Sequence, residues 1–272
     1  KGRFHLRFSD GSIAHAEKVV LAVGGRGVSA VDMSSVIPCE LTRPVLGPLA
    51  TDSRITRQLN NIRVKCSVSL ERSGSLVARE EGELLFRDYG VSGVCVFNLS
   101  RFACEGDVLS IDFLPHMPAA DRDAWLFARR KRLSARLGEN GQIAAEDVLR
   151  GAMLPQVAQV LCKCAGIDPA RPLSKKDVLA LSRVIGGLRL TVRGIGDAKQ
   201  CQVSRGGLSV AAFDPQTMGA VRASGLFAAG EALDVDAPCG GYNLHWAWSS
   251  GLLAGVSAAR SAVSADGEGE GE

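Results

Sequence analysis

Residues 225–255 read GLFAAGEALDVDAPCGGYNLHWAWSSGLLAG, and this stretch decides the fold. It places an acidic loop, LDVD, and two adjacent glycines directly before a helix-forming run. A helix start leaves several backbone N–H groups without an intrahelical partner and carries partial positive charge. Glycines before it let an oxygen-bearing ligand approach those groups closely. The stretch predicts a ligand-binding helix start, for a phosphate or for the pyrimidine edge of a flavin. A tightly packed turn is the alternative.

The composition is that of a globular protein. The chain has 272 residues, of which 46% are apolar and 22% charged, and its formal net charge is +3. No block of lysine and arginine suggests nucleic acid, no apolar stretch reaches membrane-spanning length, and no signal peptide is seen. The eight cysteines include no CxxC pair, which is typical of reduced cytoplasmic thiols that bind no metal. We expect a soluble cytoplasmic protein without nucleic-acid or membrane partners.

The first 43 residues predict part of an α/β domain. RFHLRFSDGSIAHAEKVVLAVGG reads as two strands around an Asp-Gly turn and then an apolar third strand, covered on both faces as in a parallel sheet. The following GGRGVSA fits a loose dinucleotide-binding pattern. It makes a poor primary phosphate loop, because the next residues form a poor crossover helix and no acidic residue follows at the required distance. The side-chain-free end of AVGG would still let a flat ligand pass over its backbone.

The middle of the chain predicts an insertion. Residues 62–113 contain the short segments IRVKCSVSL, GELLFRDYG, GVCVFNLS and DVLSIDFLP, which indicate an antiparallel sheet or small barrel. Residues 118–186 turn helical, with Ser174 and Asp177 as a variant of the capping box. The domains are therefore expected at 1–43 and 199–262 for the α/β part and 44–198 for the insert. The glycine-rich end, 263–272, is expected to be a disordered tail.

The signature at the end of the chain resembles that of a known family. Gly230–Glu231, Leu233–Asp236, Gly240–Leu244 and Ala247–Gly251 match its Gly-Glu, Leu-Asp-x-Asp, Gly-Gly-Tyr-Asn-Leu and Ala-x-x-Ser-Gly pattern. The segments RPVLGPL, EGELLFRDYGVSGVCVFNLSR, RGGLSVAAFDPQTM and AVGG are similar to further family segments. The chain therefore resembles the BaiN/RdsA-like flavoproteins, also described as aminoacetone-oxidase-like NAD(P)/FAD-dependent oxidoreductases.

The resemblance implies an α/β fold: a Rossmann-like FAD-binding domain with an inserted β-barrel-like and helical domain. The family begins with a βαβ unit whose glycine-rich loop binds the FAD pyrophosphate, and no such unit is found in this sequence. We therefore expect an incomplete FAD-binding domain and weak or absent FAD binding by this chain. Val23 and Ser204 also stand where the family has threonine.

The resemblance also implies which residues would bind the cofactor. Glu231 would lie near the ribityl or pyrophosphate end of FAD, and Asp234 or Asp236 would either accept hydrogen bonds from ribityl hydroxyls or cap the loop. The complete set is Val23, Gly24, Gly25, Gly230, Glu231, Asp236, Gly240, Gly241, Tyr242, Asn243 and Leu244. Residues 240–244 would present backbone N–H groups to the flavin ring, although Tyr242 could equally be a buried aromatic.

No catalytic residue is assigned. His245 is expected to be structural, Trp246 and Trp248 to pack on different faces, and Cys239 to lack a partner thiol for redox chemistry. No Ser-His-Asp or paired-carboxylate set stands out. In many flavin enzymes the isoalloxazine ring does the chemistry and the protein orients the substrate, so catalysis does not require such a set.

The leading interpretation is an FAD-dependent oxidoreductase, or the C-terminal portion of one. A hydride would pass between a small organic substrate and flavin, with NAD(P)H or oxygen as the second redox partner. The alternative is a non-catalytic flavoprotein-like binding or scaffold protein that has lost the cofactor. A third interpretation is an NAD-only dehydrogenase built on GGRGVSA. The substrate and the oligomeric state are not defined by the sequence.

Overall fold

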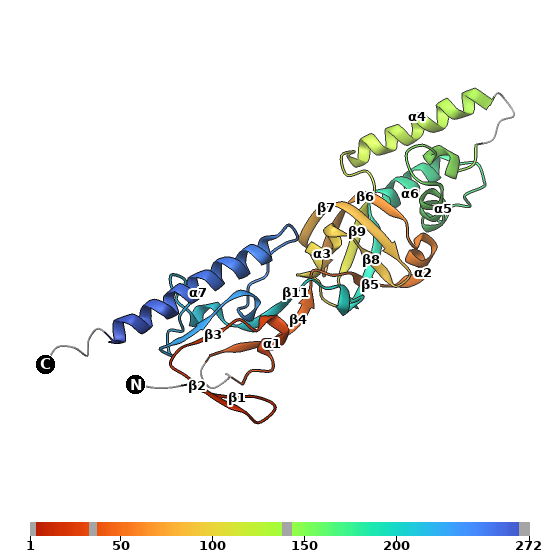
Figure 1. Ribbon diagram of the computed structural model, residues 1–272. Helices are drawn as coiled ribbons and strands as arrows, with labels where there is room; N and C mark the ends of the chain where they lie inside the picture. Colours follow the sequence, from red (N-terminus) through yellow and green to blue (C-terminus); the bar gives the residue numbers. More distant parts are fainter. Residues whose placement is uncertain (1–3, 33–36, 138–142, 267–272) are drawn as a thin grey trace. The chain divides into compact units, whose positions relative to one another are not determined.

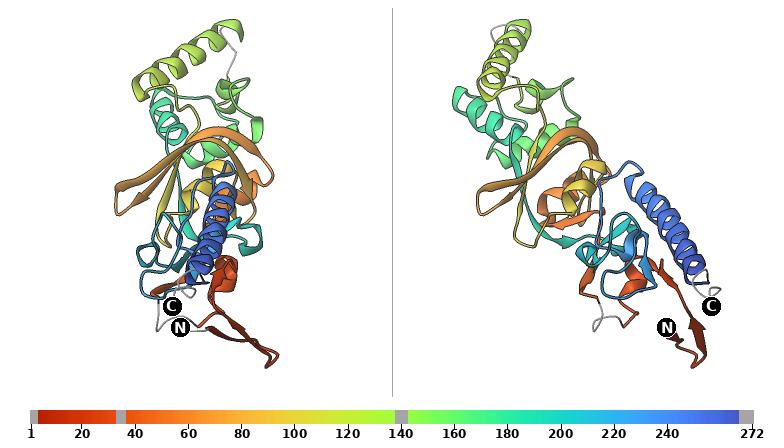
Figure 2. Two further views of the ribbon diagram at one scale, coloured as in Figure 1. Left: turned by 60° about the vertical axis from the view of Figure 1, so that its left-hand side comes forward. Right: turned by 90° about the vertical axis from the view of Figure 1, so that its left-hand side faces the viewer.

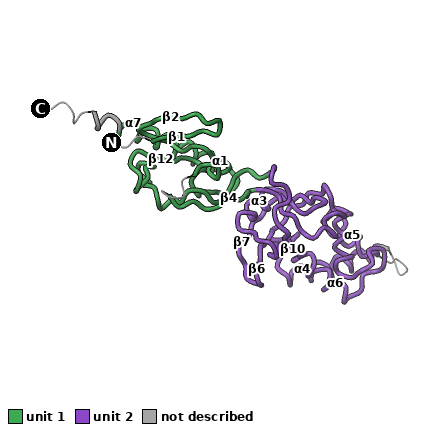
Figure 3. The backbone as a smooth tube through the Cα atoms, turned by 90° about the horizontal axis from the view of Figure 1, so that it is seen from below, with its two compact units in different colours: residues 1–46, 201–272 green, residues 47–200 purple. Residues whose placement is uncertain are grey.

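The computed structural model describes residues 4–32, 37–137 and 143–266, and the side chains of these residues except 137 and 262–266. The chain divides into two compact units (Figure 3). Unit 1 combines residues 1–46 with 201–272, and unit 2 comprises residues 47–200. The insert was expected between residues 44 and 198.

Unit 1 contains three pairs of strands (Figure 1). Strands β1 (Phe4–Arg7) and β2 (Ile13–Ala16) form the hairpin expected around the Asp-Gly turn. Strand β3 (Val19–Leu21) pairs in parallel with β12 (Leu226–Ala228), and β4 (Cys39–Val45) pairs antiparallel with β11 (Val203–Leu208). The pairing of β3 with β12 joins the two halves of unit 1 across the insert.

Helix α7 (Tyr242–Asp266) is the main helix of unit 1. It packs on β3 and β12, and the core beneath it includes Leu226, Phe227 and Ala254. Short helices α1 (Gly24–Val28), η4 (Val210–Ala212) and η5 (Gly230–Ala232) complete the unit. Because α7 continues to Asp266, the prediction of a disordered tail is wrong for residues 263–266, which continue the periodic hydrogen-bonded helix. Residues 267–272 lie outside the described residues.

Two apolar surfaces of unit 1 are more exposed than the sequence predicts. Val20 in β3 is 39% exposed, so the prediction that this strand is covered on both faces is wrong for the described residues, in which β3 pairs only with β12. On α7, four apolar side chains spaced four residues apart are exposed: Leu244, Trp248, Leu252 and Val256. Trp248 was expected to pack, and at 80% exposure it does not pack within the described structure.

Unit 2 is built on a closed six-stranded barrel with the order β10-β5-β8-β7-β6-β9. Strands β6 (Arg63–Arg72) and β7 (Ser75–Arg87) form its long hairpin (Figure 2), followed by β8 (Gly90–Ser92) and β9 (Val108–Asp112). Two strands come from outside the β-rich range 62–113, namely β5 (Leu49–Thr51) and β10 (Leu188–Ile195). They close the sheet because β10 pairs with both β5 and β9.

One segment of the barrel region forms a helix where a strand was predicted. GVCVFNLS contains β-branched and aromatic residues, but Val94–Ser100 forms helix α3. Gly93, at φ +105°, turns the chain at the end of β8, and Cys95, Val96 and Leu99 are buried on one side of the helix. Packing against the barrel therefore overrides the local strand preference.

The helical part of unit 2 lies beyond one end of the barrel (Figures 1 and 2). It contains α4 (Ala119–Leu137), η2 (Glu146–Leu149), α5 (Pro155–Cys164) and α6 (Lys175–Ile185), and the unit also has α2 (Ser53–Thr56), η1 (Arg57–Leu59) and η3 (Ala198–Gln200). Helix α6 begins with the predicted capping box of Ser174 and Asp177. AEDVLRGAML, expected to be helical, forms only the short η2 and a turn.

The described residues show no metal site. No group of three or more histidine, cysteine, aspartate and glutamate side chains is placed to hold an ion there. All eight cysteines lie within the described ranges and are free thiols, and Cys66, Cys95, Cys162 and Cys201 are buried. Among the described residues, no helix is both long and apolar enough to cross a bilayer.

Candidate functional site

A cavity of about 340 Å³ lies at the start of α7 in unit 1. Its walls come from the beginning of β11, from the loop between η5 and α7, and from the first turns of α7. The lining residues are Gln202, Val203, Glu231, Val235, Cys239, Gly240, Gly241, Asn243, Leu244, Trp246 and Ala247. The structure thus brings together five predicted site residues: Glu231, Gly240, Gly241, Asn243 and Leu244.

The two glycines give this cavity a bare backbone edge. Gly240 has φ +132° and Gly241 has φ +88°, which are conformations that L residues with side chains rarely adopt. Both glycines are exposed, and no atom lies within 4 Å of the point that a Cβ on Gly241 would occupy. A Cβ on Gly240 would instead lie 3.2 Å from the Tyr242 ring, so the helix start is open to a ligand at Gly241 and is bordered by Tyr242 at Gly240.

Asn243 fixes the loop that faces the glycines. Its Oδ1 accepts a hydrogen bond from the Ala237 N–H at 2.8 Å, and its Nδ2 donates to the Ala237 carbonyl at 2.9 Å. The first helical bond of α7 runs from the His245 N–H to the Gly241 carbonyl. Asn243 therefore acts through its side chain on the loop, while its backbone belongs to the helix start.

Glu231 is held in place from two sides. One of its carboxylate oxygens accepts a hydrogen bond from the Ser204 N–H in β11. A Cβ added to Gly25 would lie 2.7 Å from the Ser204 Cβ and 2.8 Å from the Glu231 Oε1. Gly25 is thus required where α1 meets β11, and its role in this structure is to support Glu231 rather than to line the cavity.

The two aspartates of LDVD bind the protein's own backbone and side chains. Asp234 Oδ1 accepts from the Gly206 N–H at 2.8 Å. Asp236 is nearly buried, and its carboxylate pairs with Arg205, with 2.8 Å between Oδ1 and Nε. Both aspartates therefore tie the loop before α7 to β11. Neither lines the cavity.

Gly230 anchors the other side of the helix start. Its N–H donates to Ser250 Oγ at 2.9 Å, and its carbonyl accepts from Trp246 Nε1 at 3.0 Å. Gly230 is buried with φ +63°. Trp246 thus packs as predicted and also lines the cavity. Gly230 does not line the cavity, but its carbonyl group holds the Trp246 side chain.

The remaining predicted residues lie away from the cavity lining. Val23 is exposed and Gly24 half-buried at the start of α1, Tyr242 is 60% exposed rather than buried, and His245 is exposed. The thiol of Cys239, which lines the cavity, approaches Gln202 Oε1 at 3.8 Å.

Sequence reasoning missed several residues of the site. Gln202, Val203, Val235 and Ala247 line the cavity, and Arg205 holds Asp236. A pattern signal existed for Arg205, which begins the RGGLSV segment, and for Val235 and Ala247, which lie within the matched signature. Gln202 and Val203 line the cavity because the fold brings the beginning of β11 to the helix start, which no local pattern reveals.

The site is suited to bind the electron-rich edge of a ring. The start of the long helix α7 carries partial positive charge, and the bare glycine backbone lies beside it. Such a site suits a ligand oxygen or nitrogen that gains negative charge. The cavity walls add apolar surface from Val203, Val235 and Trp246, which suits the face of a flat ring. These residues fit the isoalloxazine part of a flavin.

The fold and the site together define a Rossmann-like α/β unit that is interrupted by a closed barrel and offers a ring-sized cavity at its last helix. Comparison with protein families agrees: the model described as HI0933-like protein Rossmann domain matches residues 1–257. The chain belongs to this HI0933-like family, which is the family indicated by the sequence signature.

Three curated proteins illustrate the similarity. The 3-dehydro-bile acid delta(4,6)-reductase of Clostridium scindens is 28% identical over 270 residues, covering 92% of this chain and 64% of the reductase. The ribosomal RNA dihydrouridine synthase of Escherichia coli is 27% identical, covering 89% of this chain and 60% of the synthase. The synthase of the same name from Haemophilus influenzae is 25% identical, with 90% and 61% covered. The chain thus spans less than two thirds of the length of these relatives.

Proposed function

We propose that the protein is a flavin-dependent reductase that adds two hydrogen atoms across a carbon–carbon double bond conjugated to a carbonyl group. The observation that carries this proposal is the open cavity at the start of α7, where Gly240 and Gly241 bare the backbone. Family membership supports the redox class. The bound cofactor is FAD, and NAD(P)H is the electron donor.

The residues of the chain would hold the flavin in a defined way. The N–H groups at the start of α7 and of the twin glycines would solvate the electron-rich edge of the ring. Asn243 keeps the loop before α7 in place, and Glu231 presents a fixed carboxylate in the cavity lining. When bound, FAD supplies the group that accepts and donates a hydride.

The reaction class follows from the chemistry that the relatives' names share. Delta(4,6) denotes two double bonds, which are conjugated to a carbonyl when a 3-oxo group is present, and the 5,6 double bond of uridine is likewise conjugated to a carbonyl. Each double bond that is saturated takes up one hydride and one proton. The balance is one NAD(P)H and one proton consumed for each double bond saturated, with NAD(P)⁺ released.

We propose a small organic molecule as the substrate. The chain is nearly balanced in charge, at +3, and its densest basic run, FARRKRLSARL, lies within helix α4, with its apolar residues at helical spacing. Nucleic-acid recognition usually draws on a clustered basic surface. A conjugated enone is therefore the first substrate to test, and a uridine-containing RNA is the comparison.

Cofactor binding is tested with a matched pair of variants at Gly241. Gly241→Asn and Gly241→Asp have the same size and the same backbone strain, but only Asp adds a negative charge at the helix start. Titrating each folded chain with FAD by fluorescence quenching should show about three- to tenfold weaker binding for Asp than for Asn. Equal affinities of the two variants for FAD would overturn the proposal.

The reaction itself is tested with a 3-oxo-4-ene steroid. We expect FAD-dependent oxidation of NADPH with matching loss of the ultraviolet absorbance of the enone, and no turnover of the corresponding saturated ketone. Uridine-containing ribosomal RNA is the second arm. Reduction of the RNA alone would contradict the small-molecule part of the proposal, and turnover of neither substrate by the flavin-loaded chain would contradict the reaction class.

A further inference from the structure

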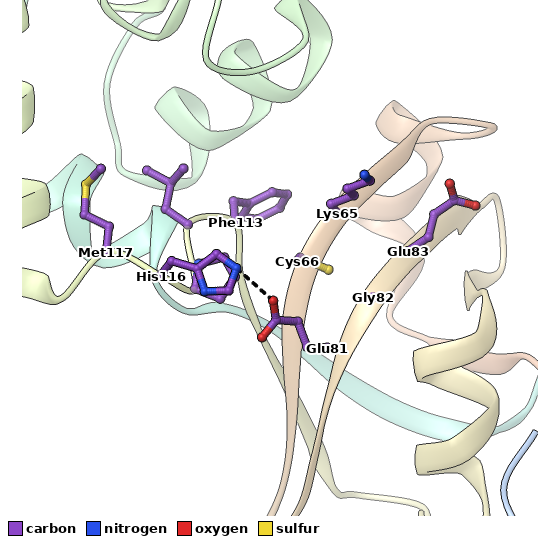
Figure 4. A pocket seen from close by; sticks show the side chains of 10 residues that line it. Lys65, Cys66, Glu81, Gly82, Glu83, Phe113, His116 and Met117 are labelled. Atoms are coloured by element: carbon purple, nitrogen blue, oxygen red, sulfur yellow. Dashed lines mark ion pairs between the residues drawn. The ribbon is translucent and has the colours of Figure 1, made fainter.

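Unit 2 contains a cavity of its own, far in sequence from the residues of the α7 site. It measures about 460 Å³ and lies between the β6–β7 hairpin and the loop 113–117 that leaves β9 (Figure 4). Small-molecule sites commonly measure a few hundred to about a thousand Å³. Its residues are Lys65, Cys66, Glu81, Gly82, Glu83, Phe113, Leu114, Pro115, His116 and Met117.

The cavity forms where two barrel strands separate. β9 pairs with β6 up to the partners Ser67 and Asp112. Beyond that pair, β6 continues beside β7, whereas the chain after Asp112 turns away into the loop 113–117. The space between the departing loop and the strands is the cavity, so its shape follows from the barrel topology.

Buried polar groups hold the loop at both ends. At its beginning, Asp112 Oδ1 accepts from the Leu114 N–H at 2.9 Å, and the Phe113 N–H donates to the Ile185 carbonyl at 2.9 Å. At its end, the buried Arg122 donates to the Met117 carbonyl at 3.0 Å and also lies 3.5 Å from Asp112. The wall is therefore formed before any ligand arrives, which lowers the entropy cost of binding.

The interior of the cavity is apolar. Phe113, Leu114, Pro115 and Met117 supply one wall from the loop. Cys66 on the strand side is 1% exposed, and burial raises the pKa of its thiol, so the thiol stays neutral and acts as an apolar group. An apolar ring or alkyl body would fill this space.

The rim of the cavity is charged, and its two glutamates have different partners. Glu83 pairs with Arg63 and lies directly opposite Lys65 in the strand register. The Glu81 carboxylate instead approaches His116 Nε2 at 3.0 Å, across the gap between strand and loop (Figure 4). Both side chains are largely exposed, at 53% and 85%, so a ligand can reach them from solvent.

We propose that this cavity binds a small molecule with an apolar body and one cationic group. The body fills the space between the hairpin and the loop, and the cation takes the place of His116 beside Glu81. An ammonium group forms with the Glu81 carboxylate a hydrogen bond that is charge-assisted at both ends. This site lies wholly within unit 2 and does not depend on the flavin proposal.

The probes are 1-naphthylmethylammonium and naphthalene-1-sulfonate, which share one apolar body and differ in charge. Calorimetric titration of the 272-residue chain should show about fivefold tighter binding of the cation, the scale expected for an exposed ion pair. Glu81→Gln should remove this preference. His116→Ala should tighten cation binding by about two- to threefold, because Glu81 then has no competing partner.

The position of the probe is tested with Leu114→Trp, which fills the cavity. Binding of both probes should fall by about tenfold or more, as expected when there is no room for the ligand without repacking. The matched controls are Leu76→Trp, at an exposed site on β7 outside the cavity, and Glu105→Gln, at an exposed site after α3. Both should bind the probes like the unmodified chain. Circular dichroism establishes that each variant is folded.

Several results would overturn the proposal. These are equal binding of cation and anion to the unmodified chain, undiminished binding to a folded Leu114→Trp variant, a cation preference that survives Glu81→Gln, and no binding of either probe up to millimolar concentration. Loss of FAD binding in the variants at Gly241 leaves this site untouched, so the two proposals can fail separately.

Discussion

At the scale of single residues, Gly25 shows how closely the supports of the α7 cavity are packed. Its missing side chain lets α1 approach β11 and the carboxylate of Glu231. The sequence singled out Gly25 as a residue of the strand end beside a cofactor. In the structure a Cβ at this position would collide with Ser204 and Glu231, which accounts for glycine there.

Gly25→Ala is therefore expected to destabilise unit 1. The new methyl group must displace Ser204 or Glu231, which costs about 1–3 kcal/mol in the free energy of unfolding. Urea denaturation followed by circular dichroism measures the loss. Gly251→Ala is the matched control, because it lies in α7 with nothing within 4 Å of the new Cβ and should be neutral or stabilising. A Gly25→Ala variant as stable as the control would show that this contact is not tight.

At the scale of elements, two helices of unit 2 show what local sequence can predict. Helix α6 was predicted because its Ser174–Asp177 capping box is a local signal, and both of its hydrogen bonds are present. Helix α3 was missed because VCVFNLS carries the β-branched and aromatic residues of a strand. What makes α3 a helix is burial of Cys95, Val96 and Leu99 against a barrel that is not visible locally.

The start of α6 should contribute a pH-dependent stability. The hydrogen-bonded guanidinium of Arg171, together with Ser174, lowers the pKa of Asp177 to about 2. An aspartate with a depressed pKa in the folded state stabilises the fold above its unfolded pKa, near 3.9, and loses that contribution as the pH falls. The window in which the stability is lost therefore runs from about pH 4 down to pH 2.

Asp177→Asn tests this dependence. The variant should be less stable than the parent chain at neutral pH, and the difference between the two free energies of unfolding should shrink as the pH falls through that window. Urea titrations at a series of pH values measure it. Asp121→Asn removes one acidic charge from the exposed first turn of α4 and should leave the pH profile of the parent. A difference for Asp177→Asn that is constant with pH would contradict the assignment.

At the scale of the whole molecule, the structure predicts that unit 2 folds alone. Residues 47–200 hold a closed barrel and a continuous core of their own. A fragment of these residues should unfold cooperatively on heating, as followed by circular dichroism. A fragment of residues 62–113 lacks β5 and β10 and cannot close the barrel, so it should show no cooperative transition. Similar melting of both fragments, or an unfolded larger fragment, would contradict the prediction.

Strands β5 and β10 explain why the sequence predicted that the insert contains a sheet or barrel but not which strands close it. β6, β7 and β9 are visible as β-rich segments, and LRLTVRG in β10 is strand-like too. That β5 and β10 join the barrel depends on long-range pairing, which the sequence does not show. In the α7 site, the glycines, Glu231 and Asn243 were found from a contiguous signature. Gln202 and Val203 were not, because only the fold brings β11 beneath the helix.

The way in which the chain leaves and re-enters unit 1 has a genetic consequence. Val45 and Val203 are partners in the β4–β11 ladder, and the Gln202 N–H donates to the Leu46 carbonyl, so the two crossing points are neighbours. Two recombination events at these points would replace the whole insert and leave the host ladder intact. Homologous genes could therefore exchange this segment as a cassette, and new ligand preferences could arise without rebuilding the remainder of the protein.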